Sequence, residues 1–435
     1  MKTKNIIIFG ILFLILAVSV DLTAQTAVAK KTVKVLVKPA HADWNYMPGE
    51  TARFEVTVLK DSLPLLNVEV RYELSQDMKP AFKKETRTLE NGVLSINAGT
   101  LKEPGFLRCR IYAKYEGKEY SGMATVAYDT KSIKASTRRP ADFQQFWDQA
   151  KADAAKIPMD VRMVLLPERC TGKVNVYHVS VQNYQMGARL YGMLCVPVAE
   201  GKYPALLELP GAGVRAYKGD LQNAEKGVIT FQIGVHGIPV NLPAEVYDNL
   251  SKGALKGYPA FNLEDKDEYY YKRVYLGCLR AVDLIYSLPQ FDGSNLIVYG
   301  GSQGGALSMV TAALDSRVKG LVAFFPAMCN LSEMTKYINN TELDLSLMFN
   351  HPIKITPDKL ETTNYYDVVN FVPQIKVPGF YSFGYNDLIC SPFSIFSAYN
   401  VVTAPKELFI VKETGHYTVP KQTQAAWTWM YHLIM

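Results

Sequence analysis

A serine flanked by glycines stands at the centre of the segment best suited to chemistry. The run Gly300-Gly301-Ser302-Gln303-Gly304 matches G-x-S-x-G, the pattern of a nucleophile elbow, in which a strand turns sharply into a helix. Glycines suit this turn because it needs backbone conformations that a Cβ atom blocks. Residues 296–299 before the turn and 306–314 after it are apolar, as a buried strand and helix require. We therefore predict that Ser302 is a nucleophile.

A histidine and an acid must activate such a serine, and after this elbow they follow in the order Ser…Asp…His. Asp387 follows the strand-like run 376–384, and His416 follows the strand-like run 408–411. The carboxyl ends of parallel strands share one edge of a sheet, where the ligand crevice lies. Ser302, Asp387 and His416 are therefore predicted to meet on one rim as a catalytic triad.

Other residues of the same types compete for the roles of base and acid. They are His41, His178, His236, His351 and His432, with Asp315, Asp344, Asp358 and Asp367 between the serine and His416. None of these follows a late strand as the pattern demands. His236 does follow a strand-like run, but it precedes the serine, so it is assigned to the substrate pocket. The alternative interpretation of the elbow is a glycine-rich connection without chemistry, which the downstream acid and base disfavour.

The elements that must position these residues begin at Arg139. Strand-like and helix-like segments alternate from there to the end of the chain, which is typical of an α/β protein with a mostly parallel sheet. Apolar residues at Phe143, Phe146, Trp147 and Ala150 predict an amphipathic helix at its start. Residues 139–435 are predicted to form the catalytic domain. Residues 131–138 are polar and aperiodic, so we expect a linker there.

A region of a different kind precedes this domain. Residues 30–130 contain short runs that alternate between apolar and polar residues, and turn signals separate several of them. The runs are 32–37, 53–58, 68–72, 108–112 and 123–127, and the turn signals are Pro48-Gly49, Asn91-Gly92 and Pro104-Gly105. Half-buried strands at this spacing predict a small all-β sandwich that is immunoglobulin-like by pattern.

The first residues have the features of a targeting segment. Lys2 and Lys4 precede the apolar run 6–20. Leu22-Thr23-Ala24 then offers a cleavage site before Gln25, and Ala27-Val28-Ala29 is a second option. The apolar run is shorter than the roughly 20 residues that a spanning helix needs. We predict that residues 1–24 are a signal peptide. The mature protein is then exported, periplasmic or extracellular, and free of membrane anchorage.

Composition narrows the range of partners and cofactors. The chain has 435 residues, a formal net charge of +6 and no Lys/Arg cluster with interleaved aromatic residues, so nucleic acid is not an expected partner. Six cysteines occur without a C-x-x-C pair, which gives no zinc or redox signature. They are Cys109, Cys170, Cys195, Cys278, Cys329 and Cys390. Their wide spacing favours buried free thiols, and we expect no metal or cofactor.

Several blocks between residues 139 and 432 match the motifs of one enzyme family. They are Asp-Phe-Gln-Gln-Phe-Trp at 142–147, Asp-Glu-Tyr-Tyr-Tyr-Lys-Arg-Val-Tyr-Leu at 267–276, Arg-Ala-Val-Asp at 280–283, Ser-Leu-Pro at 287–289, the elbow at 300–305, Leu-Asp-Ser-Arg-Val at 314–318, Gly-Tyr-Asn-Asp-Leu-Ile-Cys-Ser-Pro at 384–392 and Ala-Tyr-Asn at 398–400. Together they resemble the acetyl xylan esterase and cephalosporin-C deacetylase family of α/β-hydrolases.

The resemblance implies an α/β-hydrolase fold and the triad already inferred. It also implies an oxyanion hole formed by the backbone N–H of Gln303 and a second donor in the loop 210–213, which we assign to the Ala212 N–H. A simple glycine-rich turn is the alternative for that loop. Family members place the segment Tyr269, Tyr270 and Tyr271 near the site, so these tyrosines and His236 are predicted to line the substrate pocket; packing at a helix start is the alternative for the tyrosines.

Three positions depart from the family pattern. Tyrosine is usual where Ala212 stands, aspartate is usual where Gly277 stands, and an Arg-Gly-Gln motif appears here as Val-His-Gly-Ile-Pro at 235–239. Substrate preference and subunit packing therefore do not follow from the resemblance. The family forms ring-like homo-oligomers, which the additional N-terminal region could block.

The expected function is that of a secreted serine carboxylesterase. It removes acetyl groups from acetylated carbohydrates, such as acetyl xylan or xylo-oligosaccharides, through an acyl-enzyme. Two alternatives belong to other classes. A serine peptidase of the prolyl-oligopeptidase type carries the same elbow, but it normally has a far larger accessory domain than residues 30–130. A non-catalytic carbohydrate-binding protein would use the sandwich as its working module and would not need an intact triad.

Overall fold

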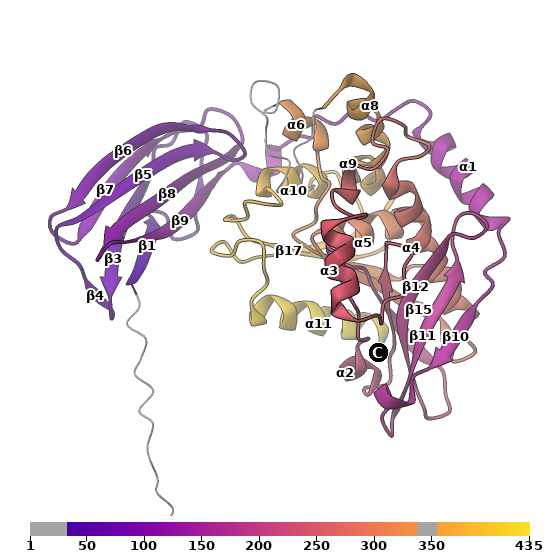
Figure 1. Ribbon diagram of the computed structural model, residues 1–435. Helices are drawn as coiled ribbons and strands as arrows, with labels where there is room; N and C mark the ends of the chain where they lie inside the picture. The colour runs from indigo at the N-terminus through magenta and orange to yellow at the C-terminus, as the bar shows by residue number, and fades with distance from the viewer. Residues whose placement is uncertain (1–32, 337–354) are drawn as a thin grey trace, which may run out of the picture.

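The computed structural model describes residues 33–336 and 355–435. A strand-rich unit and a larger unit of strands and helices lie side by side (Figure 1). We call β1 to β9 the all-β unit, and the elements from α1 to α11 the α/β unit. The predicted signal peptide, residues 1–24, lies outside the described residues, as do His351 and Asp344.

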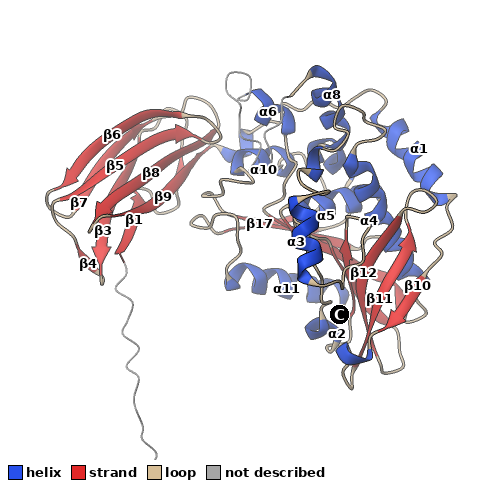
Figure 2. Ribbon diagram, in the orientation of Figure 1, coloured by secondary structure: helices blue, strands red, loops and turns tan. Residues whose placement is uncertain are grey.

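The all-β unit consists of two sheets (Figure 2). One has the order β1-β3-β4 with β7 paired to β3, and the other has the order β2-β9-β8-β5-β6. The strands are β1 (Val33–Pro39), β2 (Asn45–Tyr46), β3 (Ala52–Lys60), β4 (Leu63–Pro64), β5 (Val68–Gln76), β6 (Ala81–Leu89), β7 (Val93–Gly99), β8 (Gly105–Tyr115) and β9 (Lys118–Tyr128).

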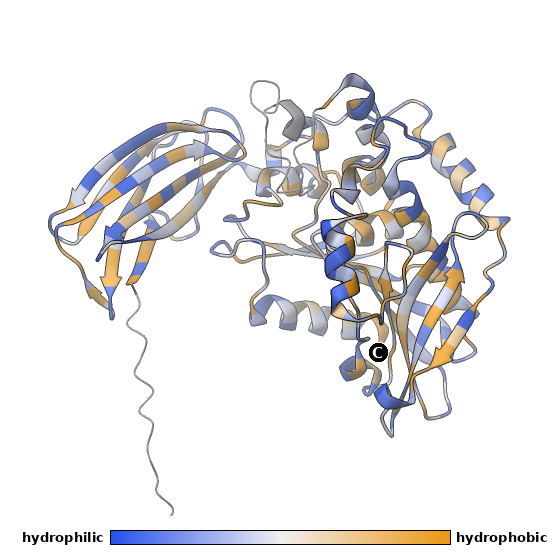
Figure 3. Ribbon diagram, viewed as in Figure 1, coloured by the Kyte–Doolittle hydropathy of each residue, from blue (hydrophilic) through white to orange (hydrophobic). Residues whose placement is uncertain are grey.

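The alternating sequence of these strands explains how the two sheets form one core. Phe54, Val56 and Val58 of β3 are fully buried, whereas Arg53 before them and Glu55 between the first two are exposed. Hydropathy accordingly alternates along the strands in Figure 3. The first half of β8 differs, because residues 105–109 are buried on both faces of the strand. Its outer face is covered by the α/β unit.

The α/β unit is built on one mixed sheet, in which the described residues form nine strands. Their order is β10-β11-β12-β14-β13-β15-β16-β17-β18. The bounds are β10 (Arg162–Leu165), β11 (Val174–Gln182), β12 (Arg189–Pro197), β13 (Tyr203–Glu208), β14 (Ile229–Gly234), β15 (Phe291–Gly301), β16 (Gly320–Phe324), β17 (Gly379–Phe383) and β18 (Lys406–Ile410). Strands from β14 to β18 are parallel, as the alternation of elements predicted, whereas β10, β11 and β12 pair antiparallel with their neighbours.

Helices cover both faces of this sheet. They are α1 (Phe143–Ala155), α2 (Leu221–Ala224), α3 (Ala244–Lys252), α4 (Tyr270–Ser287), α5 (Gln303–Leu314), α6 (Leu331–Lys336), α8 (Pro357–Tyr366), α9 (Val368–Phe371), α10 (Pro392–Tyr399) and α11 (Pro420–Ile434). Leu207 and Val298 pack in the cluster with α1, α4 and α5, and their strand neighbours Leu206 and Ile297 pack in the cluster with α11. Successive strand residues therefore bury opposite faces of the sheet.

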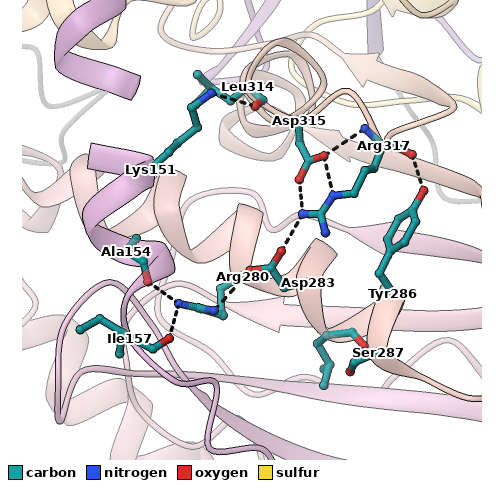
Figure 4. A network of polar contacts seen from close by, with 11 residues as sticks. Lys151, Ala154, Ile157, Arg280, Asp283, Tyr286, Ser287, Leu314, Asp315 and Arg317 are labelled. Atoms are coloured by element: carbon teal, nitrogen blue, oxygen red, sulfur yellow. Dashed lines mark hydrogen bonds and ion pairs between the residues drawn. The ribbon is translucent and has the colours of Figure 1, made fainter. Parts of the chain in front are cut away.

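Two of the family-like blocks form a polar network that joins helices (Figure 4). The buried Arg280 side chain on α4 donates to the carbonyl oxygens of Ala154 and Ile157, at 2.7 and 3.0 Å. One turn further along α4, the Asp283 carboxylate accepts from Arg317 at 2.6 Å. These blocks thus tie α1, α4 and the end of α5 together, away from the nucleophile.

A buried carboxylate anchors the segment between the two units. Asp367 is fully buried. It accepts hydrogen bonds from the Thr137 hydroxyl and from the backbone N–H groups of Asn330, Leu331 and Val369, at 2.5 to 2.9 Å. Burial raises the pKa of Asp367 to about 6 while these four bonds act in the opposite direction, so the group is ionised at neutral pH.

We expect Asp367→Ala to lower the free energy of unfolding by about 3 kcal/mol or more, because it leaves several buried donors without an acceptor. Urea unfolding at pH 7 measures this loss. Asp358→Ala, at an exposed position in the first turn of α8, serves as control and is expected to cost less than about 1 kcal/mol. Equal stability of the two variants would contradict the anchoring role.

All six cysteines lie in the described residues, and none is disulfide-bonded. Cys170 is partly exposed and the other five are buried. Between residues 33 and 336 and from 355 onward, no helix has the length and apolarity needed to cross a bilayer.

Candidate active site

Ser302 lies at the turn between β15 and α5. Its backbone has φ 58° and ψ −122°, a strained conformation for a residue with a side chain, of the kind that concentrates at functional sites. The glycines around it permit a close approach to the end of β13. A Cβ atom on Gly300 or Gly304 would lie 2.4 or 2.1 Å from the Leu209 carbonyl oxygen. The turn therefore holds Ser302 directly against the loop that follows β13.

Asp387 and His416 lie just beyond the carboxyl ends of β17 and β18. The His416 Nδ1 and Asp387 Oδ2 atoms are 2.9 Å apart. Asp387 is fully buried, and its Oδ1 accepts from the backbone N–H groups of Ile389 and Cys390, at 2.8 and 2.9 Å. A carboxylate on Nδ1 favours the tautomer that carries its proton there, which leaves Nε2 free to accept one.

Ser302 and His416 line one cavity of about 840 Å³. The Phe325 ring packs against the His416 imidazole, with centroids 4.7 Å apart. The rest of the cavity wall is mixed in character; it includes Ala212, Tyr271 and Gln303 near the serine and the charged residues Glu208, Arg215 and Lys218. Burial raises the pKa of Glu208, whose carboxylate accepts from the Tyr299 hydroxyl at 3.0 Å.

Gln303 occupies a position that sequence reasoning considered only for its backbone. Its N–H is at the first turn of α5, where helix N–H groups have no intrahelical acceptor. Its buried side chain donates through Nε2 to the Pro210 carbonyl at 3.1 Å. Its Oε1 accepts from the hydroxyls of Tyr258 and Tyr271, at 2.9 and 2.8 Å. The side chain thus links the elbow to the loop that carries Ala212.

The other residues assigned to the pocket lie behind this wall. Tyr271 lines the cavity, but Tyr269 and Tyr270 do not. The Tyr269 hydroxyl donates to the Pro259 carbonyl at 2.9 Å. His236 is also buried; its Nδ1 lies 2.7 Å from the Tyr270 hydroxyl and its Nε2 lies 3.0 Å from the Gly213 carbonyl. His236, backed by Tyr270, therefore supports the loop 210–213 from outside the cavity, whereas Tyr269 bonds the segment 258–260.

Cys390 is a neighbour of the site that the residue pattern did not assign. It lines the same cavity as Ser302 and His416. Burial, together with the nearby Asp387 charge, raises the pKa of this thiol well above its usual value, so the group stays neutral. Its position inside the family-like block 384–392 was the only signal for it. Among the described residues, no group of three or more histidine, cysteine or acidic side chains is arranged to hold a metal ion.

The mixed sheet and the elbow between β15 and α5 are those of an α/β-hydrolase. Residues 125–433 match the model of the acetyl xylan esterase family, AXE1. The chain is 37% identical to acetyl esterase Axe7A of Xylanibacter ruminicola over 400 aligned residues. The alignment covers 91% of this chain and 89% of that protein.

Solved structures show the same relationship. An acetyl xylan esterase from Paenibacillus sp. R4 is 25% identical with a TM-score of 0.58, over 70% of this chain and 98% of that one. Acetyl xylan esterase 1 from Thermoanaerobacterium sp. JW/SL YS485 has the same fold, with 21% identity and a TM-score of 0.60 over 70% of this chain and 97% of that one. The chain belongs to the acetyl xylan esterase family and is a carboxylic ester hydrolase, which confirms the resemblance drawn from its sequence blocks.

Proposed function

We propose that this protein removes acetyl groups from acetylated carbohydrates, with Ser302 as nucleophile, His416 as general base and Asp387 as the acid that orients it. The observation that carries this proposal is the 2.9 Å contact of His416 Nδ1 with a buried Asp387 carboxylate, in a cavity that His416 shares with a serine on a strained elbow.

The chemistry follows from these positions. His416 Nε2 takes the hydroxyl proton as Ser302 Oγ attacks the ester carbonyl. The tetrahedral intermediate collapses, and the sugar hydroxyl leaves with the proton from His416. Water, deprotonated by the same nitrogen, then attacks the acetyl-serine and releases acetate. Asp387 holds the imidazole in place and stabilises the imidazolium formed in each half of the reaction.

The oxyanion of each intermediate is assigned to two backbone donors, the N–H groups of Gln303 and Ala212. The first belongs to the N-terminal turn of α5 and the second to the loop after β13, and both residues line the cavity. A donor of this kind stabilises the transition state by about 3 kcal/mol. The Gln303 side chain holds the two donors in register, because it bonds the Pro210 carbonyl in the same loop.

We therefore expect Gln303→Ala to lower kcat about 10- to 100-fold, because small misplacements of catalytic groups have effects of that size. The backbone N–H of residue 303 remains in this variant, so the loss reports the position of the loop. Steady-state hydrolysis of p-nitrophenyl acetate measures it. Gln149→Ala, an exposed change on α1 away from the cavity, is the control, and a Gln303→Ala enzyme as fast as this control would contradict the role.

The carbohydrate part of the proposed substrate is supported by the family and by three charged residues of the otherwise mixed cavity wall, Glu208, Arg215 and Lys218. The decisive experiment measures acetate release from acetylated xylo-oligosaccharides beside hydrolysis of p-nitrophenyl acetate and of a peptide amide. Acetate release supports the proposal. Turnover of p-nitrophenyl acetate alone would keep the triad and exclude this sugar class. Amide cleavage alone would indicate a peptidase, and no turnover of any substrate would indicate a binding protein.

We also infer the finer organisation of the chain. The two facing sheets of the all-β unit support an immunoglobulin-like sandwich over residues 30–130, followed by a linker at 131–138 and a catalytic domain at 139–435. The basic and apolar residues of segment 1–24 support its removal on export to the periplasm or the extracellular space.

A further inference from the structure

The loop that carries Asp387 is enclosed on one side by the all-β unit. Phe106 of β8 packs edge-on against Tyr385 and stacks on Phe396 of α10, with ring centroids 5.1 and 5.9 Å away. These residues belong to one buried apolar cluster that also contains Ala127 and Cys390. This contact accounts for the buried outer face of β8. It places the second sheet of the all-β unit directly behind the acid loop.

A buried ion pair lies at the centre of this contact. Arg108 lies on β8, and Asp77 directly follows β5. The Arg108 Nη2 and Asp77 Oδ1 atoms are 2.7 Å apart, and each side chain is only 3% exposed. Charges buried to this degree lose hydration, so a pair of this kind persists only where its remaining hydrogen-bonding groups are satisfied. Within the all-β unit, Arg108 Nε donates to the Thr125 hydroxyl at 3.0 Å.

The other bonds of the pair reach across to the acid loop. Arg108 Nη2 lies 3.4 Å from the Asp387 carbonyl oxygen. The Asp77 Oδ2 atom accepts from the Ser391 hydroxyl at 2.5 Å and from the Phe393 N–H at 3.3 Å. The ion pair therefore contacts the loop at the residue that carries the acid and again where the loop enters α10.

A second contact links the same unit to the histidine loop. The Asn386 side-chain amide donates to the Met123 carbonyl of β9 and to the Glu413 carbonyl, each at 3.3 Å. Glu413 precedes His416 by three residues. One side chain thus holds the acid loop, the histidine loop and the all-β unit together.

We propose that Asp77 and Arg108 are positioning residues for Asp387, so that the all-β unit forms part of the frame of the active site. The inference rests on the proposed triad. From within the α/β unit, the Asp387 carboxylate is held by N–H groups of its own loop. The backbone of that loop is held by the ion pair. A planar guanidinium suits this task, because it serves Thr125, Asp77 and Asp387 at once, which a single ammonium group does not.

The first test replaces Asp77 with asparagine in the full-length protein. The variant keeps the side-chain volume but removes the negative charge of the carboxylate. That carboxylate pairs with Arg108 and accepts a hydrogen bond from the Ser391 hydroxyl. We expect kcat to fall about 10- to 100-fold, as for other small displacements of catalytic groups, with KM unchanged because neither residue lines the cavity. Val70→Ala leaves a cavity in the core of the all-β unit and therefore also lowers stability. It serves as the control for that effect, and its kcat is expected to stay at the wild-type value.

Three further variants keep the proposal testable if Asp77→Asn folds poorly. Ser391→Ala removes one hydroxyl from the contact and changes no charge, so it is expected to lower kcat severalfold, and Ser391→Thr, which keeps the hydroxyl, is expected to restore it. Arg108→Lys keeps the positive charge but replaces the planar guanidinium, with its several N–H donors, by a single ammonium group. It is expected to lower kcat and to leave KM unchanged.

The outcomes separate this inference from the proposed triad. If Ser302→Ala abolishes turnover while Asp77→Asn and Ser391→Ala lose only thermal stability, as Val70→Ala does, the positioning role is wrong and the triad stands. If Ser302→Ala remains active, the triad itself is wrong.

Discussion

Replacing Ser302 with alanine is expected to lower kcat about 10⁶-fold, as removal of the nucleophile does in comparable triads. Only the hydroxyl group is lost, because alanine keeps the Cβ atom and the backbone of residue 302 in the elbow between β15 and α5. Binding of substrate is expected to change little, since the cavity and the oxyanion donors remain. Hydrolysis of p-nitrophenyl acetate measures the loss, and covalent labelling by a fluorophosphonate probe is expected to disappear with it.

Ser308→Ala provides the matched control for this variant. Ser308 is also on α5 and is fully buried, but its hydroxyl donates to the Gly304 carbonyl at 2.8 Å and does not line the cavity. We expect its kcat to stay within a few-fold of wild type. A folded Ser302→Ala protein that still hydrolyses the ester at the wild-type rate would require a different nucleophile.

Replacing Asp387 with asparagine is expected to lower kcat about 10⁴-fold, by analogy with the same change in a Ser-His-Asp triad. Oδ1 of Asp387 accepts from the N–H groups of Ile389 and Cys390, so the amide oxygen of asparagine takes that place. Its NH₂ group then faces His416 Nδ1 and donates to it. The imidazole proton moves to Nε2, which can no longer accept the proton of Ser302.

Asp315→Asn is a suitable control for that prediction, because Asp315 is another aspartate between the serine and the histidine. It caps the end of α5, pairs with Arg317 at 2.6 Å and does not line the cavity. Its loss is expected to affect stability but to leave kcat within a few-fold. Burst kinetics with p-nitrophenyl acetate show whether Asp387→Asn slows acylation as expected. A decrease of less than tenfold would contradict the orienting role of Asp387.

The sequence alone determined the family, the parallel half of the sheet and the residues proposed as the triad. It could do so because each of these depends on neighbours in the chain. The elbow is a run of five residues whose glycines accommodate one turn, and Asp387 and His416 each follow a short apolar strand. The common edge of a parallel sheet then brings three distant segments together without any further information.

Tertiary structure alone decided how these groups are supported. Asp77 and Ser391 are 314 positions apart. The sequence around neither residue indicates that the loop after β5 will form a hydrogen bond with the start of α10. The same holds for the Gln303 side chain, whose partners come from η3 (Tyr258–Ala260), α4 and the loop after β13. It also holds for Tyr269, Tyr270 and His236, which lie behind the cavity wall.

The physical reason is the range over which each kind of information acts. Backbone conformation and the alternation of apolar residues are set by positions a few residues apart, so the sequence reveals them directly. The partner of a buried polar group is set by which surfaces meet when the units pack, as Arg108 shows. It lies in a strand whose alternation predicts an exposed outer face, yet it is buried because the acid loop covers it.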